Sequence, residues 1–254
     1  GQELEGVGRY DTNIVGGQRW STARAYLEPA RARSNLAVIA EVMVERVLLD
    51  GQRACGIALR GKDGPVTYRA RREVILASGA IGSPVILQHS GIGNGEDLSA
   101  AGITVKHELP GVGRNLQDHL EVYVQHACKQ PVSLQPNLQF WRRPFIGLQW
   151  LFRKGPGASN HFEAGGFIRS NDDVAYPNLM FHFLPISVRY DGTASKSDHG
   201  YQVHIGPMYS NAEGSVKITS TDPKVKPALR FNYLSTDQDR REWVEAIQTA
   251  RKIL

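Results

Sequence analysis

The sequence has 254 residues, of which 41% are hydrophobic and 22% charged, so it can bury a core and does not have the composition of a disordered chain. Its 30 basic and 25 acidic side chains leave a formal net charge of +5, and the basic residues are scattered instead of forming a stripe with aromatics. This pattern gives little support to nucleic-acid binding. No apolar run approaches membrane-spanning length, and no signal peptide is visible.

The two cysteines, Cys55 and Cys128, do not form a CxxC pair, so no zinc or dithiol redox motif is present. Free thiols fit a reduced, intracellular setting, and a single disulfide is also compatible with the sequence. The chain begins with Gly1 and ends within a helical pattern. We therefore expect a piece of a longer protein.

The first seventy residues predict a loop followed by a strand ribbon. Residues 1–20 are rich in glycine and lack periodicity, whereas 36–49, 55–59 and 66–70 are apolar or β-branched runs. Asp50-Gly51 between two such runs is a strong signal for a tight hairpin. A three-stranded ribbon is therefore expected.

The stretch EVILASGAIGSPVILQHSGIG at 73–93 predicts a buried strand, a turn of small residues and a short helix. Ser83-Pro84 is the order that a helix start favours, and Gly91 suits a left-handed helix end. Such a turn lets a phosphate-bearing ligand approach the backbone. A close-packed turn without a ligand is the other interpretation.

A helical turn over 97–101 and a short strand over 103–105 are expected next. The segment LPGVGRNLQDHL at 109–120 combines glycines with polar side chains. It could line a ligand, or it could be a structural loop held by its own hydrogen bonds.

Period-two alternation begins near residue 120 and predicts a second part built on an antiparallel sheet. Expected strands cover 120–125, 163–169, 178–184, 201–208 and 214–220, with a helix over 145–153 and a polar linker over 188–200. The segment 236–254 predicts a helix with Thr236 as its cap and one apolar face. The fold class expected is α+β, in two parts.

Several motifs, in order along the chain, resemble the glucose-methanol-choline family of flavin oxidoreductases. They are GAIGSPVILQHSGIG at 79–93, PGVGRNLQDHLE at 110–121, SNHFEAGGFIRS at 159–170, FHFLP at 181–185 and YQVHIGPM at 201–208. The last three are most similar to the bacterial choline-oxidising members. The similarity covers essentially the whole chain.

This resemblance implies FAD as the cofactor. The family's GxGxxG fingerprint would precede residue 1, and its catalytic histidine would follow Leu254. The resemblance assigns 1–118 to the middle of an α/β FAD-binding domain and 119–235 to a substrate-binding domain. The helix at 236–254 continues the second domain or returns toward the first. The fragment alone is expected to be inactive.

The resemblance also assigns cofactor-binding residues. Val44 would contact the adenine edge through its backbone, and its side chain is otherwise an ordinary strand valine. The turn of small residues would lie beside the ribose and pyrophosphate, and the NLQDH loop would run close to the cofactor or serve loop structure. These residues are Ala77, Ser78, Gly79 and Ala80 in the turn, and Asn115, Asp118 and His119 in the loop.

Glu163 is the leading substrate-binding candidate, because the choline-oxidising relatives place a carboxylate at this position beside the trimethylammonium head. A permanent cation requires Coulomb attraction and aromatic faces, since its nitrogen cannot donate a hydrogen bond. Phe183 is a candidate wall and Tyr201 a weaker one, although either ring could be a core residue. Three histidines rank lower, because a lone strand histidine is more often structural. They are His182, His199 and His204.

The function implied is hydride transfer from choline to flavin, giving betaine aldehyde. The partners implied are choline or a similar small alcohol and a membrane electron acceptor, with no nucleic acid and no metal. The expected location is peripheral, on the cytoplasmic side of a bacterial membrane or at the mitochondrial inner membrane. The alternatives are a family member acting on a neutral alcohol and a truncated, non-catalytic remnant.

Overall fold

The computed structural model describes residues 4–162, 164–195 and 197–254, and the chain divides into two compact units. Each unit combines segments that are far apart in the sequence. Unit 1 contains Gly1–Leu36, His119–Ser210 and Thr236–Leu254, and unit 2 contains Ala37–Asp118 and Asn211–Ser235. The predicted domains, 1–118 and 119–235, are continuous stretches of sequence, unlike these units. The assignment of those ranges to FAD binding and substrate binding stays a prediction.

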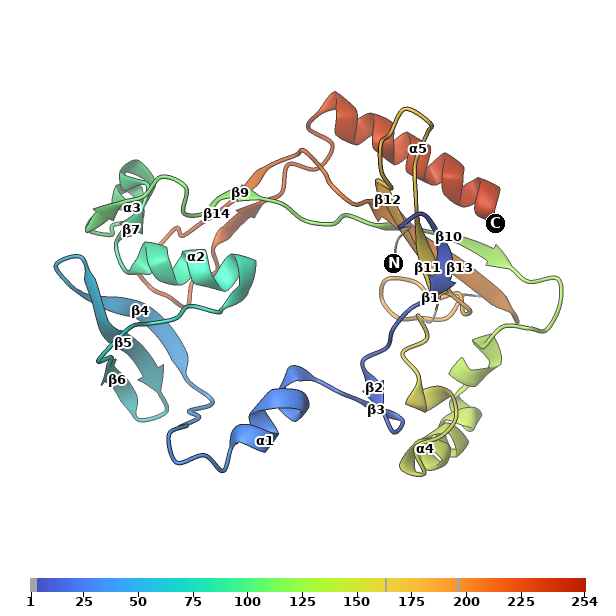
Figure 1. The fold of residues 1–254 in the computed structure, drawn as a ribbon, viewed down its shortest axis with the longest axis horizontal. Helices are drawn as coiled ribbons and strands as arrows, with labels where there is room; N and C mark the ends of the chain where they lie inside the picture. The colour runs from blue at the N-terminus through green and yellow to red at the C-terminus, as the bar shows by residue number, and fades with distance from the viewer. Residues whose placement is uncertain (1–3, 163, 196) are drawn as a thin grey trace. The chain divides into compact units, whose positions relative to one another are not determined.

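Unit 1 is built on a five-stranded antiparallel sheet with the order β1-β11-β12-β13-β10 (Figure 1). The strands are β1 (Gly6–Arg9), β10 (Val122–Ala127), β11 (Ala164–Ile168), β12 (Leu179–Leu184) and β13 (Gly200–Pro207). The prediction of a loop over 1–20 is wrong for Gly6–Arg9, which form the strand β1. β1 pairs with β11, with Gly6 opposite Phe167, and no local sequence pattern reveals a pairing between segments so far apart in the chain.

One face of this sheet is covered by α5 (Asp237–Ile253), which Figure 1 shows running along the strands. The predicted cap is confirmed, because Thr236 Oγ1 accepts the N–H of Asp239 at 3.1 Å. The helix buries Ala246 and Ala250 against a cluster on alternate positions of β12 and β13. That cluster consists of Leu179, Phe181, Val203 and Ile205.

Shorter elements complete unit 1. The short strands β2 (Ile14–Val15) and β3 (Gln18–Arg19) form a hairpin with a two-residue turn. The helical segments are the π-helix η1 (Ala23–Leu27), α1 (Glu28–Ala30), the 3₁₀ turns η2 (Gln135–Leu138), η3 (Phe140–Arg142) and η4 (Pro156–Ala158), and α4 (Arg143–Leu151). Over the described ranges, none of the helices has the length and apolar character needed to cross a bilayer.

Unit 2 contains the predicted ribbon, in the order β4 (Met43–Asp50), β5 (Arg53–Gly61) and β6 (Gly64–Arg69). The hairpin signal is confirmed, since Asp50 pairs with Arg53 and Gly51 takes a φ of +57°. The first strand begins at Met43, later than the β-branched pattern suggested. The structure thus has the expected α+β class, with antiparallel sheets and separate helices.

The helix after the ribbon, α2 (Gly79–His89), begins earlier than predicted and contains Pro84 within it. Its end is as predicted, with Gly91 at a φ of +84°. The preceding buried strand is wrong in this structure, because residues 74–78 have no ladder partner among the described residues and Ile75 is 78% exposed. An apolar run becomes a buried strand only when neighbours cover it.

The remaining elements of unit 2 follow α2 along the chain. They are β7 (Ile92–Gly93), α3 (Gly95–Ala100), β8 (His107–Glu108), β9 (Arg114–Leu116), β14 (Gly214–Lys217) and β15 (Ala228–Arg230). The strand expected at 103–105 is wrong, since the chain pairs with β7 only at β8. Gln88 joins α2 to the β14 segment through both ends of its side-chain amide, bonding Val216 O and the N–H of Ile218 at 3.0 Å each.

Candidate functional site

The start of α2 exposes backbone N–H groups among small side chains. The first N–H groups of any helix lack intrahelical partners, and the Ser78 side chain makes no capping bond here. Instead, the Ser78 N–H donates to Ser83 Oγ at 3.0 Å. A Cβ added at Gly79 would meet no atom within 4 Å, so the approach is open. This helix end can therefore receive a phosphate group.

A cavity of about 320 Å³ adjoins this turn within unit 2. Val44 and Ser78 both line it, so the structure brings together one predicted residue from the ribbon and one from the turn. Most of the other lining residues are apolar, among them Ile57 and Ile86, while Arg69 and Glu73 add one charge of each sign. Apolar walls for a base and free N–H groups for phosphate together fit a nucleotide.

The NLQDH residues do not line this cavity. Asn115 is exposed in β9 with a φ of +55°, and His119 is exposed and falls in unit 1. Asp118 accepts a hydrogen bond from the Tyr233 hydroxyl, and burial together with this carboxylate raises the pKa of Tyr233 to about 12. The hydrogen bond from Tyr233 thus gives Asp118 a structural role in this loop. The role of Asp118 in cofactor binding stays a prediction.

A second cavity, the aromatic pocket, lies in unit 1 and has a volume of about 470 Å³. Its walls come from the end of β1, the segments before β10 and β11, and β12. The lining residues are Tyr10, Asp11, Glu121, Asn160, Phe162, Met180 and His182. None of these lining residues is a lysine or an arginine.

The rings of the aromatic pocket are held in place by the sheet. Tyr10 donates its hydroxyl to Phe181 O at 2.7 Å, and its ring centroid lies 5.4 Å from that of His182. Phe162 lies edge-on to His182, with centroids 6.1 Å apart. Burial lowers the pKa of His182 below its ordinary value of 6.5, against an opposing effect of Glu121. The imidazole therefore favours its neutral form and does not repel a cation.

Glu121 is oriented by a chain of side-chain hydrogen bonds. Gln202, which is 1% exposed, accepts the N–H of Val188 at its Oε1 (2.9 Å), so its Nε2 faces His204 Nε2 as a donor at 2.5 Å. His204 then donates from Nδ1 to Glu121 Oε1 at 2.7 Å. With this tautomer His204 directs its Nδ1–H at Glu121 and holds that carboxylate at the edge of the aromatic pocket.

The predicted substrate residues fall in different places. Glu163 lies outside the described residues. Phe183 and Tyr201 have ring centroids 5.8 Å apart and line a separate, mostly apolar cavity of about 260 Å³ together with Leu254. They share the sheet face that α5 covers, whereas His182 points to the opposite face because side chains alternate along a strand.

The sequence reasoning missed the other pocket residues. Tyr10, Asp11, Glu121 and Phe162 carry no local signature of a binding site. Phe162 and Glu121 do lie within quoted motifs, SNHFEAGGFIRS and PGVGRNLQDHLE, but the resemblance assigned neither of them a role. His182 was named but ranked low, and its place beside two other rings is a property of the folded sheet.

Comparisons with known proteins agree with this architecture. Models of the GMC oxidoreductase family match residues 1–121 and 210–254. The chain is 58% identical over its full length to an oxygen-dependent choline dehydrogenase of Staphylococcus xylosus and 56% identical to one of Staphylococcus aureus. It spans 45% of the length of each relative.

Solved structures show the same fold. Pyridoxine 4-oxidase from Mesorbium loti superposes on 99% of this chain and 46% of its own, with a TM-score of 0.82 and 27% identity. An Aspergillus oryzae formate oxidase variant, described in a study of FAD modification, covers 99% of this chain and 48% of its own, with a TM-score of 0.89 and 22% identity. The chain therefore belongs to the GMC oxidoreductase family.

Proposed function

We propose that this chain is a segment of an FAD-dependent dehydrogenase that oxidises choline to betaine aldehyde. The observation that carries the proposal is the aromatic pocket, in which two carboxylates and three rings meet and none of the described lining residues is a lysine or an arginine. The choline dehydrogenases that the chain resembles over its whole length support the same substrate.

The cofactor proposed is FAD, and the residues of unit 2 fit it. Val44 and the apolar walls beside it would hold the adenine end, and the exposed N–H groups from Gly79 onward would hold phosphate. When bound, the flavin supplies a ring that accepts a hydride. The small residues Ala77, Ser78 and Ala80 permit the backbone to approach, and no side-chain carboxylate of α2 opposes the phosphates.

The aromatic pocket would hold the trimethylammonium head. Glu121 supplies Coulomb attraction, and the faces of Tyr10 and Phe162 supply cation–π contacts of about 0.5–2 kcal/mol each. Asp11 adds a second carboxylate to the lining. His204, itself held by Gln202, donates to Glu121 and keeps this carboxylate in place beside the pocket. Glu163 remains a proposed contact to the same head group.

The test compares choline with 3,3-dimethylbutan-1-ol, its uncharged isostere, in the full-length enzyme. Two unit charges 5 Å apart interact by about 3 kcal/mol at an effective dielectric constant of about 20, and solvent in an open pocket reduces this to about 1–2 kcal/mol. Glu121→Gln should therefore raise KM for choline about 5–30-fold and leave KM for the isostere within about twofold.

Glu28→Gln, at an exposed position in α1, is the matched control and should change neither value. Glu163→Gln is measured alongside. Equal turnover of choline and the isostere by the unmodified enzyme would contradict the choline assignment and favour a neutral-alcohol enzyme. Absence of flavin absorbance and of turnover in the full-length protein would favour the non-catalytic remnant.

Two electron acceptors compete within this proposal. The family resemblance implies a membrane acceptor and a peripheral location on the membrane, at the cytoplasmic face in bacteria or the mitochondrial inner membrane. The names of the staphylococcal relatives specify oxygen. Stoichiometric hydrogen peroxide during choline turnover without added acceptor would identify oxygen, whereas turnover that requires added quinone would identify the membrane acceptor.

A further inference from the structure

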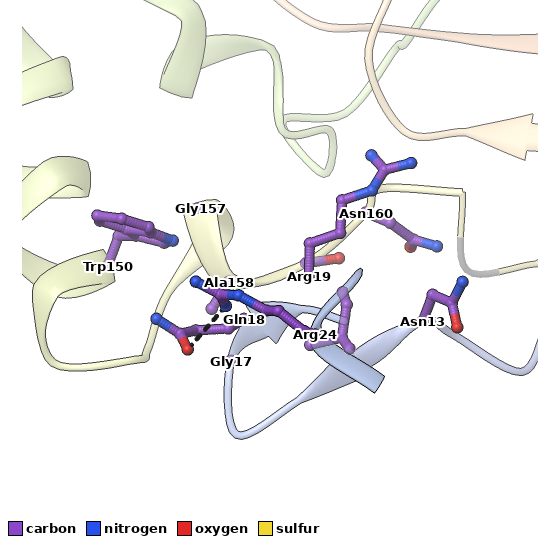
Figure 2. A pocket seen from close by; sticks show the side chains of 11 residues that line it. Asn13, Gly17, Gln18, Arg19, Arg24, Trp150, Gly157, Ala158 and Asn160 are labelled. Carbon is purple, nitrogen blue, oxygen red and sulfur yellow. Dashed lines mark hydrogen bonds between the residues drawn. The ribbon is translucent and has the colours of Figure 1, made fainter. Parts of the chain in front are cut away.

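A third cavity, which we call the arginine pocket, lies within unit 1 and has a volume of about 440 Å³. The β2–β3 hairpin and η1 form one side, and the segment after α4 forms the other (Figure 2). Its polar lining consists of Asn13, Gln18, Arg19, Arg24, Ser159 and Asn160, with Trp150 as an aromatic wall. None of the lining residues that the structure describes is a carboxylate.

No carboxylate of the described residues neutralises the charge in the arginine pocket. Arg24 is half-buried, and its guanidinium donates to the neutral amide of Gln18 (Nη1 to Oε1, 3.0 Å), as Figure 2 shows. Among the residues that the structure describes, neither Arg19 nor Arg24 has a carboxylate partner within 4.0 Å. Arg19 is exposed and Arg24 half-buried, so the two cations keep contact with water, and an anion in this cavity would be attracted by positive charge that no described carboxylate neutralises.

The walls of the pocket are fixed by backbone contacts. Ile14 pairs with Arg19 and Val15 with Gln18 across the hairpin. Gly17 closes the turn at a φ of +70°, and a Cβ there would lie 2.4 Å from Arg153 O. Only glycine permits this approach, so the hairpin sits tightly on the chain after α4. The Arg19 side chain therefore extends from an anchored hairpin, and the Arg24 side chain, from η1, is tied to the same hairpin by its bond to Gln18.

From this geometry we propose that the arginine pocket binds a small organic oxyanion. A guanidinium group suits the paired oxygens of a carboxylate or a phosphate, so Arg24 alone can hold one oxyanion, and the carboxamides of Asn13 and Asn160 add neutral hydrogen-bonding groups. Trp150, with 45% of its surface exposed, offers a flat apolar face. A ligand that joins a planar apolar group to an oxyanion uses both features.

Calorimetric titration of the purified protein tests this proposal with benzoate and phenyl phosphate as probes. We expect saturable binding of at least one probe and none of benzyl alcohol, which keeps the ring without the charge. Arg24→Gln should weaken binding at least tenfold, while Arg24→Lys should keep part of it. Arg31→Gln, an exposed arginine outside the pocket, should bind as the unmodified protein does.

The two probes distinguish the oxyanion, since tighter binding of one identifies carboxylate or phosphate. Far-UV circular dichroism confirms that each variant is folded. Trp150→Leu provides a second arm that keeps both arginines, and it should weaken the ring-bearing probes more than inorganic phosphate. Absence of saturable binding by the unmodified protein, or equal binding by folded Arg24→Gln, would overturn the proposal.

Discussion

The buried amide of Gln88 should determine how firmly α2 is attached to the rest of unit 2. Its side chain is 3% exposed and bonds two backbone groups, Val216 O and the N–H of Ile218, each at 3.0 Å. Gln88→Leu keeps a similar volume but leaves both groups without these partners. The two unsatisfied buried groups together cost about 2–6 kcal/mol, and leucine burial returns about 1.5–3 kcal/mol. Taking the middle of each range, we expect a net loss of about 2 kcal/mol.

Hydrogen exchange measured by mass spectrometry provides a local readout, which matters because a chain of two units need not unfold in two states. Peptides that contain Ile218 should exchange markedly faster in Gln88→Leu. Gln52→Leu makes the same substitution at an exposed turn of unit 2 and should leave exchange unchanged. Equal exchange at Ile218 in the two variants would refute the idea that this amide joins the helix to the β14 segment.

Two further predictions concern ionisable groups. The Tyr233 hydroxyl should ionise near pH 12, whereas an ordinary tyrosine has a pKa of 10.0. The unfolded chain therefore loses the hydroxyl proton at lower pH than the folded chain does. The free energy of unfolding should fall as pH rises from 10 to about 12. Tyr233→Phe should remove one late-titrating tyrosine from the absorbance titration at alkaline pH, and an unchanged titration would contradict the contact with Asp118. Burial lowers the pKa of His89 below 6.5, and its Nε2 has no hydrogen-bond partner among the described residues. The unfolded chain therefore binds a proton at His89 more readily than the folded chain does. As a result, the free energy of unfolding falls as pH drops below 6.5. His89→Leu should reduce this loss by up to about 1.4 kcal/mol per pH unit in urea unfolding, and an identical pH slope would argue against it.

Local chemistry in the sequence determined much of the framework. Asp50-Gly51 specifies the hairpin of the ribbon, because few other residues accept its backbone angles. Thr236 begins α5, since its hydroxyl meets the N–H of Asp239. Period-two alternation identified the strands of unit 1 that lie beyond residue 120. Each signal depends only on residues that are neighbours along the chain.

The tertiary structure decided which of these pieces form a site. Pairing of β1 with β11 brings Tyr10 to the sheet from a stretch that has no strand pattern of its own. Because neighbouring side chains of a strand point to opposite faces of the sheet, His182 lies in the aromatic pocket and Phe183 lies on the face that α5 covers. Glu121 becomes a pocket carboxylate only because His204, 83 residues later in the chain, orients it. Pockets of this kind result from contacts between distant segments, whose energies no local pattern encodes.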